Sequence, residues 1–266
     1  MADENFGAWA LPPDLEALHD AVIEFALGVN GRVDAQFEKE VFRGPLGSKA
    51  LQRFHRTAIV THRSVKSLCL AGWTAITPGV MRTLVDILVS VFALGRKPED
   101  AELMGFRYMA HGLIEGMYDQ DSEPEKRQRD TALVDVLKAN LSTTDIKRAD
   151  DLILAYQQKI PPYWYWPDIP NPGTAIKQNM NRIWILWHNF CGTSHGADIG
   201  SVLFSDNPDS TGINPEENPR RTRSAIVISS RFLLDISYAR AQCENVADED
   251  EYKRFVRDYI KPQEGK

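Results

Sequence analysis

The sequence predicts an all-α fold, a single-domain multi-helix bundle with a long central helix and two long loops. Three observations predict it. Apolar residues recur every three to four positions along most of the chain, which is the period of an amphipathic helix. Proline, glycine and capping residues divide the chain into helix-sized pieces, and no piece alternates apolar and polar residues as a half-buried strand does. A length of 266 residues with 43% hydrophobic and 26% charged residues suits a globular domain.

Each predicted helix begins at a proline or a capping side chain and ends at a glycine or before a proline. The predicted starts are Asp14 after Pro12 and Pro13, Ser48, Thr77 with Pro78, Pro98, Ser122 with Pro124 and Glu125, Thr144 and Pro219. The predicted helices are 14–29, 32–42 after Gly31, 48–72, 77–95, 98–118, a helix from 122, 144–160, 179–201, 219–245 and 249–260. Residues 1–13 are expected to be loosely ordered and residues 14–262 to form the helical domain, with a mobile loop over 206–219.

Composition and charge narrow the function classes. A net charge of −6 argues against a general nucleic-acid-binding surface. The three cysteines lie far apart without a CxxC pair, which predicts free thiols in a reducing compartment. The acidic N-terminus lacks the apolar segment of a signal peptide, and the most apolar run, 80–94, is short and contains Arg82 and Asp86. We therefore expect a cytoplasmic protein without a membrane partner.

The predicted central helix, 179–201, carries two of the six histidines close to its C-terminal end. On a helical wheel, His188 and His195 share a stripe beside an apolar face, and Ser194 adjoins them. One interpretation is that these three side chains line a pocket. The alternative is a buried helix whose polar side chains are satisfied inside the core.

The segment 160–173 contains five prolines and four adjacent aromatic residues, so a regular helix is excluded there. Its rings, among them Trp164 and Trp166, can form a wall on which a ligand stacks. The alternative is a hydrophobic clamp that closes the bundle.

Two further pairs of charged or polar residues are candidates for ligand binding. Arg82 and Asp86 lie four apart on an apolar helix, so they can form an ion pair that is at least partly buried, or Arg82 can hold an anion while Asp86 orients it. His62 and Arg63 are adjacent on another helix, where His55 lies seven residues before His62. Histidines seven apart are separated by about 10 Å along a helix, too far to chelate one metal ion simply, and no metal or cofactor is predicted.

Two weaker patterns are the pair His111 and Glu115, four apart, and an arginine followed by histidine at Arg56/His62 and Arg182/His188. The first suits acid–base chemistry or an exposed helix face. The second is similar to the motif of helical HEPN ribonucleases, although a straight helix would point the two side chains about 120° apart.

Three motifs in order resemble a bacterial family called domain of unknown function 5677. They are His62-Arg63-Ser64, the run from Met81 to Asp86, and Trp166-Pro167 followed by an aromatic helix and Ser194-His195-Gly196. The resemblance covers residues 50–205. The chain departs from the family pattern with Thr83 for serine, Asp86 for glutamate and Trp187-His188 where tyrosine is expected. The resemblance implies a helical fold and no particular chemistry.

Two hypotheses of function follow. In the first, the chain is a binding protein with an Arg/His-lined central pocket, and its partner is a small anionic ligand or another protein, a second copy of this chain included. In the second, it is a metal-independent, HEPN-like and defence-related ribonuclease, with His188 or His195 as general base and Arg82 or Arg63 stabilising charge. Whether the chain is an enzyme stays open, and RNA is a partner only under the second hypothesis.

Overall fold

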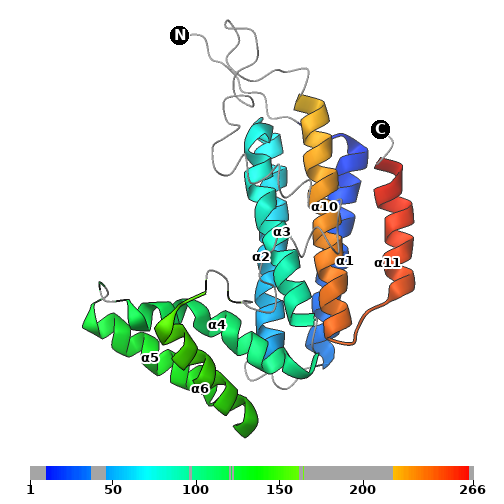
Figure 1. Ribbon diagram of the computed structural model, residues 1–266. Coiled ribbons are helices and arrows are strands. Elements are labelled where there is room, and N and C mark those ends of the chain that lie inside the picture. The colour runs from blue at the N-terminus through cyan, green and yellow to red at the C-terminus, as the bar shows by residue number, and fades with distance from the viewer. Residues whose placement is uncertain are drawn as a thin grey trace, which may run out of the picture. The chain divides into compact units, whose positions relative to one another are not determined.

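The computed structural model describes residues 10–36, 46–95, 98–119, 121, 123–161, 164 and 218–263 (Figure 1). All regular elements within these ranges are helical, which confirms the predicted all-α class. They are α1 (Pro13–Gln36), α2 (Leu46–Leu70), η1 (Thr74–Ile76), α3 (Thr77–Gly95), η2 (Pro98–Asp100), α4 (Ala101–Tyr118), α5 (Pro124–Lys138), α6 (Thr143–Gln158), α10 (Asn218–Cys243), α11 (Glu249–Phe255), the π-helical turn η3 (Val256–Ile260) and η4 (Lys261–Gln263).

The chain divides into two compact units, whereas the sequence predicts one domain. Unit 1 comprises Met1–Val33, His55–Val89 and Pro172–Lys266, and unit 2 comprises Asp34–Phe54 and Ser90–Asn171. Divisions between the units therefore fall inside α1, α2 and α3.

Helix α1 of unit 1 is longer than the sequence suggests. The predicted break at Gly31 is wrong, because the helix continues to Gln36. Glycine inside a helix is unfavourable by about 1 kcal/mol relative to alanine, which is a weak preference. Packing outweighs it here: Val29 and Val33 on either side of Gly31 are both buried, and Arg32 pairs with Glu251 of α11 at 3.0 Å.

Helices α1 and α10 run parallel within unit 1. Near their N-termini, Arg223 of α10 donates to Asp14 of α1 at 3.2 Å. Near their C-termini, Arg240 of α10 donates to Asn30 of α1. The apolar side chains of both helices form much of the core of this unit, namely Leu15, Leu18, Val22, Ala26, Val29, Ile226, Leu233, Leu234 and Ile236.

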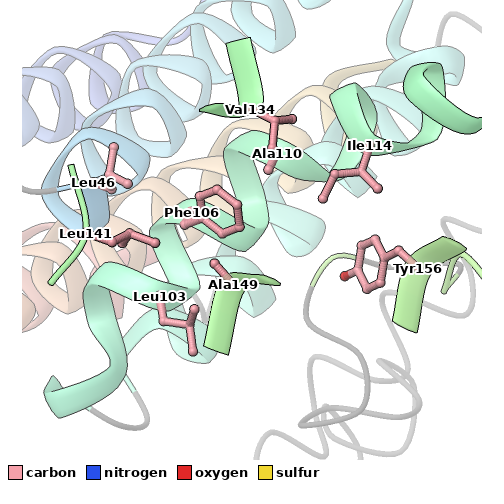
Figure 2. Close-up of a cluster of buried hydrophobic side chains, with 9 residues drawn as sticks. All are labelled: Leu46, Leu103, Phe106, Ala110, Ile114, Val134, Leu141, Ala149 and Tyr156. Carbon is pink, nitrogen blue, oxygen red and sulfur yellow. The ribbon is translucent and has the colours of Figure 1, made fainter. Parts of the chain in front are cut away.

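Unit 2 is built on α4, against which α5 and α6 both pack. Figure 2 shows its core, in which Phe106 of α4, fully buried, lies among Leu103, Leu141 and Ala149. Glycine permits a close approach of two backbones in this unit. A Cβ atom built on Gly105 of α4 would lie 2.4 Å from the backbone of Leu46 at the start of α2. The two backbones can therefore approach this closely only without a side chain at position 105.

The cap of α2 also differs from the prediction. Ser48 was expected to cap this helix, but α2 begins at Leu46, and Ser48 lies inside its first turn. The carboxylate of Glu102 in α4 accepts hydrogen bonds from Leu46 N at 2.7 Å and Gly47 N at 3.3 Å. A negative charge at a helix N-terminus satisfies open N–H groups and interacts favourably with the helix dipole. The cap comes from a residue more than fifty positions away, so local sequence gives no sign of it.

Helix α3 is the one helix among the described residues that is long and apolar enough to cross a membrane. This is weak support for a span, because a core helix of a soluble protein meets the same criteria, and 56% of its most apolar window is buried inside the protein. Leu84, Val85 and Val91 are fully buried. The absence of a membrane partner and a cytoplasmic location stay predictions.

Candidate functional site

Several candidate residues lie outside the described part of the chain. They are His188, Ser194, His195 and Trp166, together with the rest of 179–201 and the loop residues 206–217. The pocket predicted around the two histidines, and the role of either as a general base, stay predictions.

Trp164 lies in unit 2 and is buried, with 8% of its surface exposed. Its ring centroid is 6.1 Å from that of Phe54 and 5.5 Å from that of Tyr108. A ring that stacks on a ligand needs an accessible face. For this residue the geometry agrees with the hydrophobic-clamp alternative rather than with the stacking wall.

Arg82 and Asp86 form the ion pair that their spacing predicts, with Arg82 Nε 3.8 Å from Asp86 Oδ2 on α3. The pair is more exposed than expected, since 27% of the arginine side chain and 54% of the aspartate side chain are accessible. Exposed pairs of this kind contribute little to stability, from near zero to about 1 kcal/mol. Arg82 is thus paired and only partly accessible.

Helix α2 carries the most ordered polar arrangement among the described residues. Its buried face holds His55, His62 and Cys69, spaced seven residues apart, and each contacts a hydroxyl group of α10. His55 Nε2 lies 2.8 Å from Ser237 Oγ, and His62 Nδ1 lies 2.9 Å from Ser229 Oγ. The side chain of Cys69 forms a hydrogen bond with the side chain of Thr222. Contact positions rise along α2 and fall along α10, so the two helices are antiparallel. We call these three pairs the hydroxyl ladder.

The hydrogen bonds of His55 determine its tautomer. The hydroxyl of Ser237 donates its only proton to the carbonyl of Leu233 at 2.7 Å, so it must accept the hydrogen bond from His55 Nε2–H. The Nδ1 atom of His55 then carries a lone pair. Arg240 Nη1 donates to it at 2.8 Å and also donates to Asn30. The imidazole is therefore neutral and is held from both sides.

His62 has the opposite tautomer by the same argument. Ser229 donates its proton to the carbonyl of Ile226 at 3.2 Å, so His62 Nδ1–H is the donor in their contact. The ring of His19 from α1 stacks on His62 with 4.6 Å between centroids, and His19 Nδ1–H donates to Asp20 at 2.9 Å. Within the described residues, Nε2 of both His19 and His62 is buried without a hydrogen-bond partner.

The protein environment keeps these histidines neutral. Burial, assisted by the positive charge of Arg240, lowers the pKa of His55 to about 3. Burial lowers the pKa of His62 to about 3 as well, with smaller contributions from His19, Lys66 and Arg63. Both side chains are completely inaccessible. His62 is therefore a buried core residue. It could bind a ligand, as predicted, only if α2 and α10 moved apart.

Arg63, the neighbour of His62, points the other way and is exposed. Arg56, the neighbour of His55, is exposed as well, and it lies seven residues earlier on the same face. Val60 lies between them with 61% of its surface accessible. We call these three residues the arginine face of α2. The hydroxyl ladder fixes the rotation of the helix, and the same rotation turns this face to solvent.

All charged side chains of α2 are positive. The helix contains Lys49, Arg53, Arg56, Arg63 and Lys66 and not one acidic residue, in a chain of net charge −6. On α2, Lys66 pairs with Glu16. Cationic side chains elsewhere in unit 1 are commonly paired with carboxylates, as in Arg32–Glu251, Arg82–Asp86, Arg223–Asp14, Arg231–Asp235, Lys253–Glu249 and Arg257–Asp258. Within the described ranges, Arg56 and Arg63 form no ion pair.

Part of this arrangement could be read from the sequence and part could not. The seven-residue spacing of His55 and His62 is visible, as is the His62-Arg63 pair. Their partners Ser229, Ser237 and Arg240 carry no pattern that singles them out, because they lie more than 160 residues away in the chain. Among the described residues, no three His, Cys, Asp or Glu side chains lie together as they would to hold a metal ion.

No family model, no curated protein and no solved structure matches this chain. The resemblance to family 5677 and to HEPN ribonucleases therefore stays a prediction from the motifs alone.

Proposed function

We propose that this chain is a binding protein that recognises an acidic segment of another protein through the arginine face of α2. The observation that carries the proposal is the pair of exposed guanidinium groups of Arg56 and Arg63, which form no ion pair with the described residues and lie on a helix without acidic residues. An arginine without a carboxylate partner is available to one supplied from outside. Arginine is also enriched in protein interfaces, where its planar group binds carboxylates in a bidentate manner.

The spacing of the two groups suggests the form of the partner. Seven residues on a helix place Arg56 and Arg63 about 10 Å apart along its axis. Carboxylates seven residues apart on a partner helix have the same separation. A partner side chain midway between these two carboxylates would contact Val60. An apolar centre flanked by charged groups is the usual organisation of such an interface.

The buried side of α2 supports this proposal indirectly. Binding is stronger when the binding groups are held in place before the partner arrives. His55 and His62 are fixed by hydrogen bonds to α10, so the helix backbone that carries the adjacent arginines has one rotation and one register.

The experiment measures binding of a synthetic helical peptide that carries glutamates seven residues apart with a leucine between them. Fluorescence anisotropy should show saturable binding that weakens with added salt. The double charge reversal Arg56→Glu with Arg63→Glu should weaken it by tenfold or more. The matched control, Arg254→Glu with Lys261→Glu on the exposed surface of α11 and η4, changes the net charge equally and should leave binding unchanged.

Equal loss of binding in both double variants would show a general charge effect and would contradict the proposal. A single-stranded RNA oligonucleotide is the competing probe. Tighter binding of RNA than of the peptide, lost on reversal of Arg56 and Arg63, would favour the nucleic-acid hypothesis instead.

A further inference from the structure

Helices α1 and α2 of unit 1 expose adjacent faces. Lys66 of α2 pairs with Glu16 near the start of α1. Further along α1, Arg240 of α10 joins the two helices by donating to both Asn30 and His55. The two helices are therefore antiparallel neighbours. Lys66 and Glu16 are themselves partly accessible, with 18% and 43% of their side chains exposed, so the exposed sides of α1 and α2 meet in one continuous surface.

The part of this surface that α1 contributes is acidic. Asp20 and Glu24, both exposed, lie one turn apart, and Leu27 follows after a further turn with 48% of its surface accessible. Asp20 is hydrogen-bonded within its own chain, whereas Glu24 forms no ion pair inside the described ranges. The one arginine or lysine of α1 is Arg32, which pairs with α11. We call Asp20, Glu24 and Leu27 the acidic face of α1.

Two exposed glycines close to Leu27 are not required by the packing of unit 1. A Cβ atom built on Gly31 would meet nothing within 4 Å, and one on Gly28 would meet only Nη1 of Arg32 at 4.0 Å. Glycine inside a helix lowers the stability of the helix by about 1 kcal/mol relative to alanine. The missing side chains leave room for the backbone of another helix to approach α1 closely.

We propose that the acidic segment bound by the arginine face of α2 is the acidic face of α1 in a second copy of this chain, an inference that rests on the proposed function. Each copy carries one basic and one acidic face on the same surface. A two-fold axis parallel to the helices therefore places α1 of each copy over α2 of the other and forms the contact twice. The charges of the two faces are complementary, which is the observation that selects a second copy as the partner.

The positions of the charges along the helices agree with this pairing. The two contacts between α1 and α2 place Asp20 level with Arg63, and Glu24 level with Val60, about 5 Å along the axis from both Arg56 and Arg63. A two-fold axis parallel to the helices keeps these levels, so each carboxylate of one copy lies within reach of an arginine of the other. The exposed apolar side chains of the two faces lie between the charges.

The experiment is sedimentation equilibrium of the full chain over a range of concentrations from about 1 to about 200 µM, where contacts of modest area associate. The parent should form a reversible dimer that added salt weakens. Glu24→Arg should weaken dimerisation by tenfold or more, and so should Arg56→Glu with Arg63→Glu, because each places like charges opposite one another. The matched control is Asp151→Arg on the exposed side of α6, which changes the net charge as Glu24→Arg does and should leave dimerisation unchanged.

A mixture of the two reversed proteins gives the sharpest test. In a heterodimer of Glu24→Arg with the double reversal of Arg56 and Arg63, one contact keeps the original charges and the other has them exchanged. Opposite charges then face each other in both contacts. Equal amounts of the two proteins should therefore form a dimer that neither forms alone.

The second-copy inference is overturned if the parent is monomeric at every concentration, if Glu24→Arg dimerises as the parent does, or if the mixture stays monomeric. The proposed function is tested separately, because Glu24→Arg leaves the arginine face intact and should still bind the glutamate peptide. Binding of the peptide by a parent that stays monomeric would leave the proposed function standing without the second copy. Failure of the Glu24→Arg protein to bind the peptide would contradict the proposed function itself.

Discussion

Arg240 and His55 are both fully buried, and the guanidinium group donates to the imidazole Nδ1 atom at 2.8 Å. A cation thus lies directly against a histidine, which can keep this contact only while it is neutral. The pair makes the stability of unit 1 sensitive to acid.

Stability should fall as the pH is lowered below about 6.5. In the unfolded chain His55 and His62 have pKa values near 6.5, and in the folded chain both are lowered to about 3. Between these values the unfolded state binds protons that the folded state does not, so stability is complete above pH 6.5 and is lost toward pH 3. At the acid limit the loss is on the order of 4–5 kcal/mol for each histidine, a large share of a typical domain's stability. The unfolding free energy at pH 7, 5.5 and 4.5 can be measured by urea denaturation, with circular dichroism as the signal.

The variant His55→Leu with Ser237→Ala supplies the control for the acid effect. It replaces the titrating histidine and its serine partner by apolar residues. The unfolding free energy of this variant should therefore depend less steeply on pH than that of the parent. If the unfolding free energy changed equally with pH in both proteins, carboxylates and not buried histidines would determine the acid sensitivity.

The adjacent serines of α10 give a matched test of the hydroxyl ladder. Ser229 and Ser230 are both fully buried, but only Ser229 contacts His62, whereas Ser230 Oγ has no hydrogen-bond partner among the described residues. Ser229→Ala leaves the His62 donor unsatisfied and should cost about 1–3 kcal/mol in unfolding free energy. Ser230→Ala should be neutral or slightly stabilising, because alanine favours the helix. Equal effects of the two substitutions would show that the His62–Ser229 contact contributes nothing.

Two glycines of α4 should respond oppositely to alanine. A Cβ on Gly105 would lie 2.4 Å from backbone atoms of Leu46 and Gly47, which cannot move as a side chain does. Gly105→Ala should therefore destabilise unit 2 by about 1–3 kcal/mol, as overpacking does. A Cβ on Gly112 meets nothing within 4 Å, so Gly112→Ala should stabilise the helix by about 0.5–1 kcal/mol. Denaturant unfolding of both variants measures the difference, and a neutral Gly105→Ala would mean that the two backbones lie further apart.

Tyr252 should anchor α11 through its hydroxyl. The hydroxyl donates to Asp235 of α10 at 2.8 Å and accepts from Arg231 at 3.0 Å, and the carboxyl of Asp235 has a pKa raised by burial. Tyr252→Phe should lower the unfolding free energy by about 1–2 kcal/mol. Tyr259→Phe is the comparison, since Tyr259 is 40% exposed, and it should have no measurable effect. Hydrogen exchange of the α11 amides would report whether the loss is local.

The helices could be predicted because their signals are local. Threonine and proline at 77–78 predict the start of α3. Ser142, two residues before the predicted start at Thr144, caps α6 by accepting from Asp145 N at 3.2 Å. The prediction at Gly31 was wrong because glycine is a weak breaker when both flanks are buried, and the predicted cap Ser48 was wrong because the actual cap, Glu102, comes from another helix.

The candidate sites were less predictable because they join distant parts of the chain. The spacing of His55 and His62 could be seen, but nothing in the sequence shows that Ser237 and Ser229 face them. His111 could be selected from its spacing to Glu115, yet the structure pairs it with Tyr156, which is 45 residues later. Contacts of this kind depend on how helices are aligned, and amphipathic patterns fix the buried face of a helix but not its neighbour along that face.

The unequal spacing of the hydroxyl ladder restricts how this chain can vary. Its positions are evenly seven apart on α2, but on α10 they are eight and seven apart, at Ser237, Ser229 and Thr222. Sliding α10 by two turns would bring Glu244, rather than a hydroxyl, opposite His55. The observed alignment instead pairs both imidazoles with hydroxyl groups. A substitution at one member should persist in descendants of this protein only with a compensating change in its partner, so His55 with Ser237 and His62 with Ser229 should be exchanged as couples.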